Sequence, residues 1–159
     1  MKPAKIGPRN SCKAIIINGN NELLTVQKRD QDEIYFVLPG GGQRHGETFI
    51  ETIKRECREE IGGEPKVHEE ILFIREYIGK HHMFPHKHTQ VHQIEYMFLC
   101  EIGTAELGKG TEWDKGQGGI VWIKIDELHT CNFYPKKLIP EIEKYSKGEH
   151  SKIYLGDIN

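Results

Sequence analysis

The sequence has no long apolar run and no excess of basic residues. No window approaches the roughly 18 to 20 consecutive apolar residues that a membrane-spanning helix needs, so we expect no membrane association. The N-terminal stretch "MKPAKIGPRN" contains two prolines and no apolar segment, which does not fit a signal peptide. The formal net charge is −2, with 22 basic and 24 acidic residues. This balance argues against a protein that binds duplex nucleic acid.

The sequence also lacks a cysteine framework. Its four cysteines, Cys12, Cys57, Cys100 and Cys131, are widely separated and form no C-x-x-C pair. In a chain of 159 residues this spacing is typical of reduced thiols that are buried as small apolar side chains. Because disulfides are rare in reducing compartments, we expect a cytoplasmic protein.

Length and composition fit one globular domain. Hydrophobic residues make up 36% of the chain and charged residues 29%, with no internal repeat or low-complexity tract. A chain of this size can bury an ordinary hydrophobic core. We assign residues 1–10 to an N-terminal tail, residues 11–147 to a single domain, and residues 148–159 to a C-terminal tail or short strand.

The apolar pattern predicts more strands than helices. Two apolar runs in residues 11–29 flank Gly19-Asn20-Asn21, which is the pattern of a hairpin. Glycine and proline dominate residues 39–47, so this segment is predicted to be a loop. Further strands are expected at 34–38, 71–79, 92–102 and 119–125, and helices at 48–61 and 135–147. This order favours an α/β fold of the α+β kind, with a mixed sheet between helices.

The helix expected at 48–61 crowds three carboxylates into five positions: Glu56, Glu59 and Glu60. At about 100° per residue, Ile50, Ile53, Cys57 and Ile61 share the buried face, and the acids point away from the core. One interpretation is a solvated acidic face, paired with neighbouring basic side chains. The other is a site for a hard cation, in which Glu56 and Glu59 share Mg²⁺ or Mn²⁺.

The glycine-rich loop and this helix together form a recognisable motif. Gly41 to Thr48 nearly matches a phosphate-binding P-loop, but Glu47 stands where that motif needs a lysine, so a P-loop is rejected. From Gly41, "GGQRHGETFIETIKRECREEIGG" resembles the Nudix box, G-x5-E-x7-R-E-U-x-E-E-x-G-U, where U is apolar. The specified positions are all filled except the last, where Gly63 replaces an apolar residue; the matching residues are Gly41, Glu47, Arg55, Glu56, Glu59, Glu60 and Gly62.

The resemblance implies an α/β/α sandwich and a metal-dependent pyrophosphohydrolase that acts on a small nucleotide substrate. Its metal ligands would be Glu56, Glu59, Glu60 and the backbone carbonyl of Gly40, with Mg²⁺ or Mn²⁺ as the cofactor. Arg55 would orient a neighbouring glutamate, Glu47 would anchor the loop to the helix, and Gly41 and Gly42 would contact the substrate. The crowding of carboxylates would then be balanced by the bound ion.

The catalytic base has three candidates. The resemblance implies a carboxylate from a late loop, and the loop "KGTEWDKGQGG" offers Glu112 and Asp114. Glu60 is the alternative. Coupled carboxylates do not titrate individually, so the sequence does not choose among them.

Substrate specificity is less well defined by the sequence. Phe84 and Trp113 are candidates for stacking on a base, although aromatic residues are also common in cores. The histidine-rich segment 81–92 could bind a transition metal or could lie as a loop beside the pocket. The segment "YIGKHH" lacks the proline that ADP-ribose-hydrolysing relatives tend to carry after the box.

Three classes of function remain compatible with the sequence. The first is hydrolysis of a nucleoside triphosphate or of a nucleotide sugar of the ADP-ribose type. The second is a non-catalytic nucleotide sensor or regulator on the same fold, which loss of a glutamate would favour. The third is an acidic scaffold, which explains the charges but not the glycine spacing. A homodimer is left open.

Overall fold

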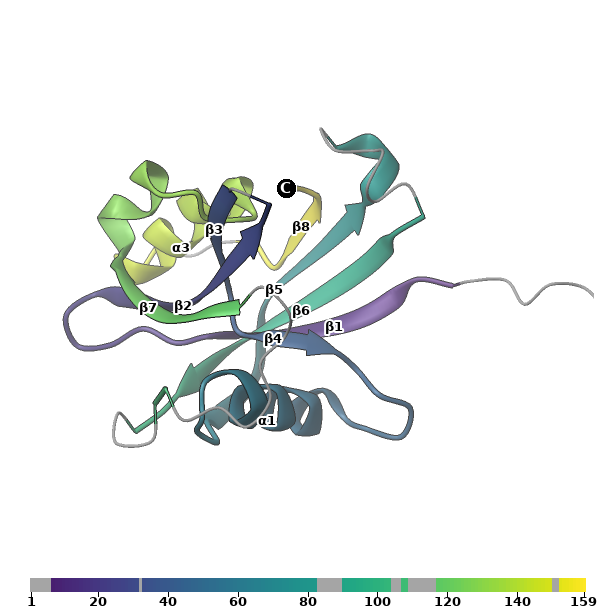
Figure 1. Ribbon diagram of the computed structural model, residues 1–159, viewed down its shortest axis with the longest axis horizontal. Coiled ribbons are helices and arrows are strands. Elements are labelled where there is room, and N and C mark those ends of the chain that lie inside the picture. The colour runs from purple at the N-terminus through teal and green to yellow at the C-terminus, as the bar shows by residue number, and fades with distance from the viewer. Residues whose placement is uncertain (1–6, 32, 83–89, 104–106, 109–116, 150–151) are drawn as a thin grey trace, which may run out of the picture.

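The structure is a computed structural model that describes residues 7–31, 33–82, 90–103, 107–108, 117–149 and 152–159. Within these residues, eight strands form two sheets, joined by two α-helices and several 3₁₀ turns (Figure 1). Across those ranges, no helix combines the length and the apolar character that crossing a membrane requires.

The larger sheet has five strands in the order β4-β1-β6-β5-β8. It is mixed, because β1 runs parallel to β6 and β5 parallel to β8, whereas β4 runs antiparallel to β1 and β5 antiparallel to β6. Its strands are β1 (Arg9–Ile15), β4 (Gly40–Gly42), β5 (Lys66–Ile78), β6 (His92–Glu101) and β8 (Tyr154–Asp157).

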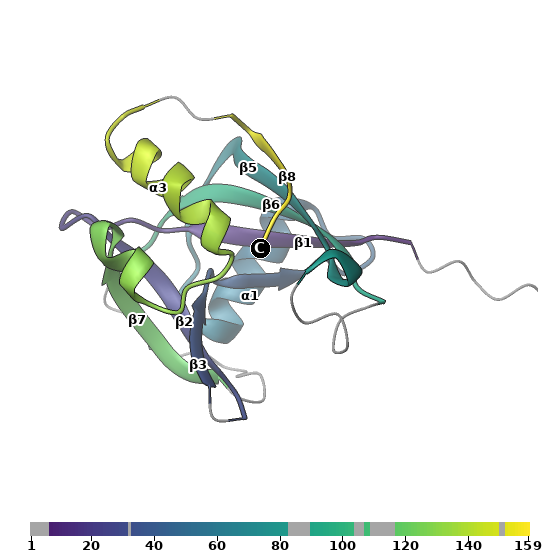
Figure 2. The same cartoon turned by 90° about the horizontal axis from the view of Figure 1, so that it is seen from above.

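The smaller sheet has three antiparallel strands in the order β3-β2-β7. They are β2 (Glu22–Asp30), β3 (Glu33–Val37) and β7 (Gln117–Lys124). Helix α1 (Phe49–Glu60) lies on one side of the strands and α3 (Ile139–Ser146) on the other (Figures 1 and 2). The 3₁₀ turns are Gly79–His81, Ile125–Thr130 and Lys136–Leu138. This arrangement confirms the predicted mixed sheet with few helices.

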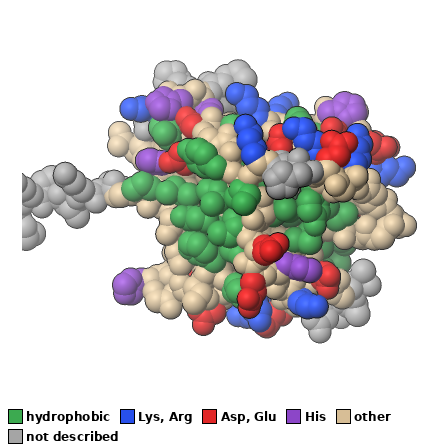
Figure 3. Space-filling model, turned by 180° about the vertical axis from the view of Figure 1, so that it is seen from behind, with side chains coloured by type: hydrophobic (Ala, Val, Ile, Leu, Met, Phe, Trp, Pro, Cys, Tyr) green, Lys and Arg blue, Asp and Glu red, His purple; other side chains and the backbone are tan. Residues whose placement is uncertain are grey.

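Two apolar clusters fill the space on either side of the larger sheet. One surrounds Phe73 and Phe133 and contains Ile142 of α3; the other contains Ile53, Cys57 and Ile61 from the α1 segment. Ile50, which shares the predicted buried face of α1, is only half-buried. Figure 3 shows further apolar side chains across the middle of the face opposite to that of Figure 1, with charged side chains above and below.

Two sequence predictions are corrected in the first third of the chain. The predicted hairpin turn forms, with an antiparallel bridge between Ile17 and Leu23 and a backbone hydrogen bond from Asn18 to Glu22, but the ladder does not extend because β1 and β2 enter different sheets. The predicted loop at 39–47 contains strand β4, which pairs with β1. A side chain at Gly40 would overlap the Cys12 carbonyl, so three successive glycines allow a strand where composition favours a loop.

Candidate active site

Helix α1 starts and stops at the predicted residues. The Thr48 hydroxyl accepts a hydrogen bond from the Glu51 backbone N–H at 3.2 Å, and the Glu51 carboxylate accepts one from the Thr48 backbone N–H at 2.7 Å. This capping box satisfies two backbone donors at the helix start. At the other end Ile61 is the C-cap, and Gly62 has φ of 88°, a conformation that glycine adopts easily. Both ends are therefore fixed, which sets the direction of the acidic side chains.

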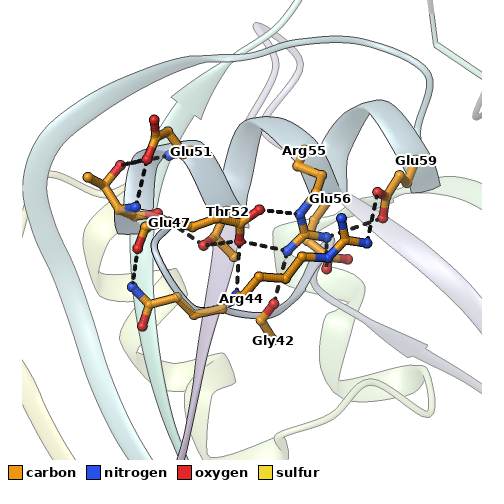
Figure 4. A network of polar contacts seen from close by, with 10 residues as sticks. Gly42, Arg44, Glu47, Glu51, Thr52, Arg55, Glu56 and Glu59 are labelled. Carbon is orange, nitrogen blue, oxygen red and sulfur yellow. Dashed lines mark hydrogen bonds and ion pairs between the residues drawn. The ribbon is translucent and has the colours of Figure 1, made fainter.

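Arg55 lies at the centre of a polar network between α1 and the glycine-rich loop (Figure 4). Its Nε and Nη2 donate to the two carboxylate oxygens of Glu47 at 2.6 and 2.9 Å, and Nη2 also donates to the Gly42 carbonyl at 3.0 Å. Its Nη1 donates to Glu56 at 2.6 Å and to Glu59 at 3.3 Å. One guanidinium therefore joins the loop to the helix and contacts two of the crowded acids.

This network shifts the titration of its members. The hydrogen bonds from Arg55 lower the pKa of Glu47 to about 2, and those to Glu47 raise the pKa of Arg55. Both shifts favour the charged forms, as expected for charge-assisted hydrogen bonds. The contact expected between Arg55 and a neighbouring glutamate is present, and so is the contact of Glu47 with both loop and helix.

Each of the three crowded acids has a cationic partner. Arg55 contacts Glu56 and Glu59, the Arg44 Nη2 lies 3.7 Å from Glu59 Oε1, and the Lys28 Nζ lies 3.6 Å from Glu60 Oε1. Arg44 and Lys28 come from outside the helix. Protein cations therefore lie beside each of the three acids in this structure.

Glu60 does not point away from the core as the helical wheel predicted. It is only 4% exposed, and its Oε2 accepts a hydrogen bond from the Gly40 backbone N–H at 2.8 Å. Burial raises the pKa of this carboxyl, whereas Lys13, the Gly40 bond and Lys28 act in the opposite direction. The wheel fails here because β4 packs over the end of the helix, which is a long-range contact.

The glycines let the backbone approach these acids. A Cβ placed on Gly41 would lie 2.6 Å from the Glu56 carboxyl carbon. Gly40 has φ of 131°, a conformation that other residues rarely adopt. The Gly40 carbonyl accepts a hydrogen bond from the Lys13 Nζ at 3.0 Å. Backbone oxygen and carboxylates therefore lie beside one another at this edge of the sheet.

The donor set suits a hard cation, although the side chains are not arranged around one. Glu56, Glu59 and Gly40–Gly42 line a cavity of about 410 Å³ together with arginine side chains. Carboxylate and carbonyl oxygens are the ligands that Mg²⁺ and Mn²⁺ prefer. Among the described residues, no group of three or more histidine, cysteine, aspartate or glutamate side chains is gathered in coordinating positions. The residues fit the cation by chemistry, and the side chains would have to leave their present partners to bind it.

Several predicted site residues lie outside the described part of the chain: Phe84, Glu112, Trp113 and Asp114. His86 and His88 of the histidine-rich segment lie outside it as well. The described His81 and His82 both contact Asp157, at 2.8 and 2.6 Å, and so connect this segment to β8.

A second cavity, which the sequence did not indicate, adjoins the first. It has a volume of about 480 Å³ and is lined by Tyr35, Tyr77 and Tyr134 among other residues. Arg9 lines both cavities. These residues come from segments far apart in the sequence, and Arg9 falls in the stretch that we assigned to an N-terminal tail. No local pattern marks them.

Comparisons with known proteins agree with this architecture. The model of the NUDIX domain matches residues 7–145, so the chain belongs to the Nudix family. An "ADP-ribose pyrophosphatase" of Methanocaldococcus jannaschii is 26% identical over 89% of this chain and 76% of its own length. Together the family and this relative identify a hydrolase that acts on pyrophosphate bonds.

Solved structures show the same fold. A Nudix hydrolase from Nitrosomonas europaea superposes with a TM-score of 0.72 at 20% identity, over 91% of this chain and 92% of that one. An ADP-ribose pyrophosphatase from Streptococcus suis superposes with a TM-score of 0.63 at 18% identity, over 95% and 98%. The predicted family and fold class are therefore confirmed.

Proposed function

We propose that the chain hydrolyses the pyrophosphate bond of a nucleoside diphosphate joined to another group, with ADP-ribose and nucleotide sugars as the first candidates. The observation that carries the proposal is the Arg55 network, which holds Glu56 and Glu59 at a polar cavity beside the glycine-rich loop. The relative from M. jannaschii supports the choice of ADP-ribose. Nucleoside triphosphates are the second class to test.

The residues that would hold Mg²⁺ or Mn²⁺ are Glu56, Glu59, Glu60 and the Gly40 carbonyl. When bound, such an ion would supply neutralisation of the phosphate oxygens and a water of lowered pKa. The Gly40 carbonyl already accepts a hydrogen bond from the Lys13 ammonium, which supports its use as a ligand for a cation. Glu60 is a candidate base because burial raises its pKa towards the range useful for proton transfer. Glu112 and Asp114 are the other candidates.

The test is a phosphate-release screen of the purified chain. It presents ADP-ribose, nucleotide sugars, dinucleoside polyphosphates and nucleoside triphosphates, each with Mg²⁺, with Mn²⁺ and with a chelator. We expect metal-dependent cleavage of ADP-ribose or a nucleotide sugar into two monophosphate products. Release of pyrophosphate from a nucleoside triphosphate would select the second class. No cleavage of any compound, with metal binding measured separately, would contradict the proposal.

Location and assembly complete the proposal. The four cysteines are free and three of them are buried, which supports a reducing compartment such as the cytoplasm. A homodimer stays a prediction that a sedimentation measurement checks.

A further inference from the structure

Arg9 connects the two cavities. It is the first residue of β1, and its side chain is exposed. The guanidinium lies beside Gly42, in the space that a side chain at Gly42 would occupy. It lines the cavity of about 410 Å³ together with Glu56 and Glu59, which we call the carboxylate cavity. It also lines the cavity of about 480 Å³ together with Tyr35 and Tyr77, which we call the tyrosine cavity. A ligand that spans both cavities therefore has to pass this guanidinium.

The other arginines that line these cavities have acidic partners. Arg44 pairs with Glu59, Arg55 with Glu47 and Glu56, and Arg75 donates to the buried Glu95 at 2.5 Å. The Arg9 guanidinium has no hydrogen-bond or ion-pair partner in the ranges that the structure describes. Its donors are therefore available to an anion, and the planar guanidinium matches a phosphate group well.

The tyrosine cavity suits a nucleoside better than a second phosphate. Tyr35 and Tyr134 meet edge to face with ring centroids 6.2 Å apart, and Val37 and Val91 add apolar surface. Aromatic walls can stack on any base. Asp30 and Glu33 also line this cavity, and their carboxylates can accept hydrogen bonds from hydroxyl or amino groups while repelling phosphate. The volume of about 480 Å³ lies in the range of small-molecule sites.

We infer that Arg9 binds the phosphate next to the nucleoside, and that the nucleoside occupies the tyrosine cavity. The substrate would then be a nucleoside diphosphate derivative whose base lies among the tyrosines and whose anhydride bond reaches the carboxylates. This inference rests on the proposed function. It assigns Arg9 as the residue that determines specificity for a nucleotide over a nucleoside.

The test measures binding, apart from catalysis. Isothermal titration in a chelator compares AMP, GMP and UMP with the corresponding nucleosides for the wild-type chain and for Arg9→Gln. We expect at least one monophosphate to bind the wild type roughly tenfold or more tightly than its nucleoside, as a charge-assisted contact allows. Arg9→Gln should abolish that preference, and Arg9→Lys should restore part of it. Arg29→Gln is the matched control, because Arg29 is exposed and lines neither cavity.

Tyr35 tests the orientation of the ligand. Tyr35→Leu should weaken the nucleoside and its monophosphate by the same factor, roughly threefold or more, because it removes an aromatic wall and leaves the phosphate contact. Circular dichroism spectra of all variants confirm that they fold. Affinities that Tyr35→Leu leaves unchanged would overturn the placement of the nucleoside.

The outcomes separate this inference from the proposed function. Cleavage of a substrate with a KM that Arg9→Gln leaves unchanged, or equal affinities of the wild type for monophosphates and nucleosides, would overturn the role of Arg9 alone. Absence of cleavage with a preference for monophosphates that depends on Arg9 would contradict the proposed function and support the phosphate contact.

Discussion

The carboxylate cavity and the tyrosine cavity adjoin at Arg9 but are built in different ways. The first is formed almost entirely by one continuous stretch, Gly40 to Glu60, in which each crowded acid has a cationic partner. The second is formed by side chains from β1, β2, β3, β5, β6 and the segment after β7. The difference indicates that the groups proposed for the chemical step are fixed locally, whereas those proposed for recognition depend on the whole fold.

The ion pairs of the carboxylate region should make it respond to mutation differently from the tyrosine cavity. In the carboxylate region, removal of the shared cation Arg55 leaves several carboxylates uncompensated, so this change should affect stability as well as activity. In the tyrosine cavity, loss of one side chain should mainly change affinity. Four predictions test this contrast, from the largest expected effect to the smallest.

Glu59→Gln should lower kcat by about 10³-fold, because it removes a negatively charged ligand from the proposed metal site. Stability should change by about 0.5 kcal/mol or less, since Arg44 is exposed and Arg55 keeps its shorter contacts with Glu47 and Glu56. Binding of monophosphates in a chelator should stay as in the wild type. Steady-state kinetics, urea unfolding and calorimetry provide the three measurements.

Glu70→Gln is the control for this variant, because Glu70 is exposed on β5 and lines neither cavity. Full activity of Glu59→Gln in Mg²⁺ would show that Glu59 is not a ligand. A parallel loss of monophosphate binding would show that the two cavities are not separate in function.

Arg55→Ala should destabilise the fold by about 2–4 kcal/mol, because it leaves Glu47, Glu56 and Glu59 without their shared donor in a largely buried place. Arg55→Lys should recover only part of this loss, since an ammonium cannot reproduce the forked contacts with Glu47. Urea unfolding measures both variants. Arg58→Gln is the control, because Arg58 is half-exposed and pairs with Glu64 at the surface. Equal destabilisation by the Arg55→Ala and Arg58→Gln changes would contradict a central role of Arg55.

The contrast between the cavities also explains what the sequence could predict. Helix α1, its caps and its acids were predictable because capping, periodicity and the Nudix box all lie within a single segment. The burial of Glu60 and strand β4 were not, because both depend on contacts of Gly40 with distant residues. Arg9 and the tyrosines were missed for the same reason: only the packing of separate strands brings them together.

Gly41→Ala should lower kcat about tenfold and cost about 1 kcal/mol of stability, because the new methyl group would displace the Glu56 carboxylate. The displaced group can rotate away, so the fold should persist while the proposed ligand is lost. Kinetics and urea unfolding measure the two effects. Gly19→Ala is the control, since a Cβ there meets no atom within 4 Å. Wild-type kcat in Gly41→Ala would show that the position of Glu56 does not matter for turnover.

The smallest effect should appear in the pH dependence of stability, where Glu47 and Glu60 act in opposite directions. The pKa of Glu47 in the folded chain is about 2, below its ordinary value of 4.5, so its contribution to stability is present above 4.5 and is lost as pH falls towards 2. The folded pKa of Glu60 is raised, so ionisation of Glu60 reduces stability as pH rises above 4.5.

Urea unfolding from pH 2 to 7 measures both effects. As pH falls, the free energy of unfolding should decrease less in Glu47→Gln than in the wild type, and the difference should be about 1 kcal/mol or less after solvent screening. The free energy of unfolding of Glu60→Gln should instead increase relative to that of the wild type as pH rises above 4.5. Other carboxyls with lowered pKa values, such as Asp157, titrate in the same acid window, but they are common to both chains. Only the difference between the curves reports on Glu47, and parallel curves would mean that the Arg55 network does not hold Glu47 ionised.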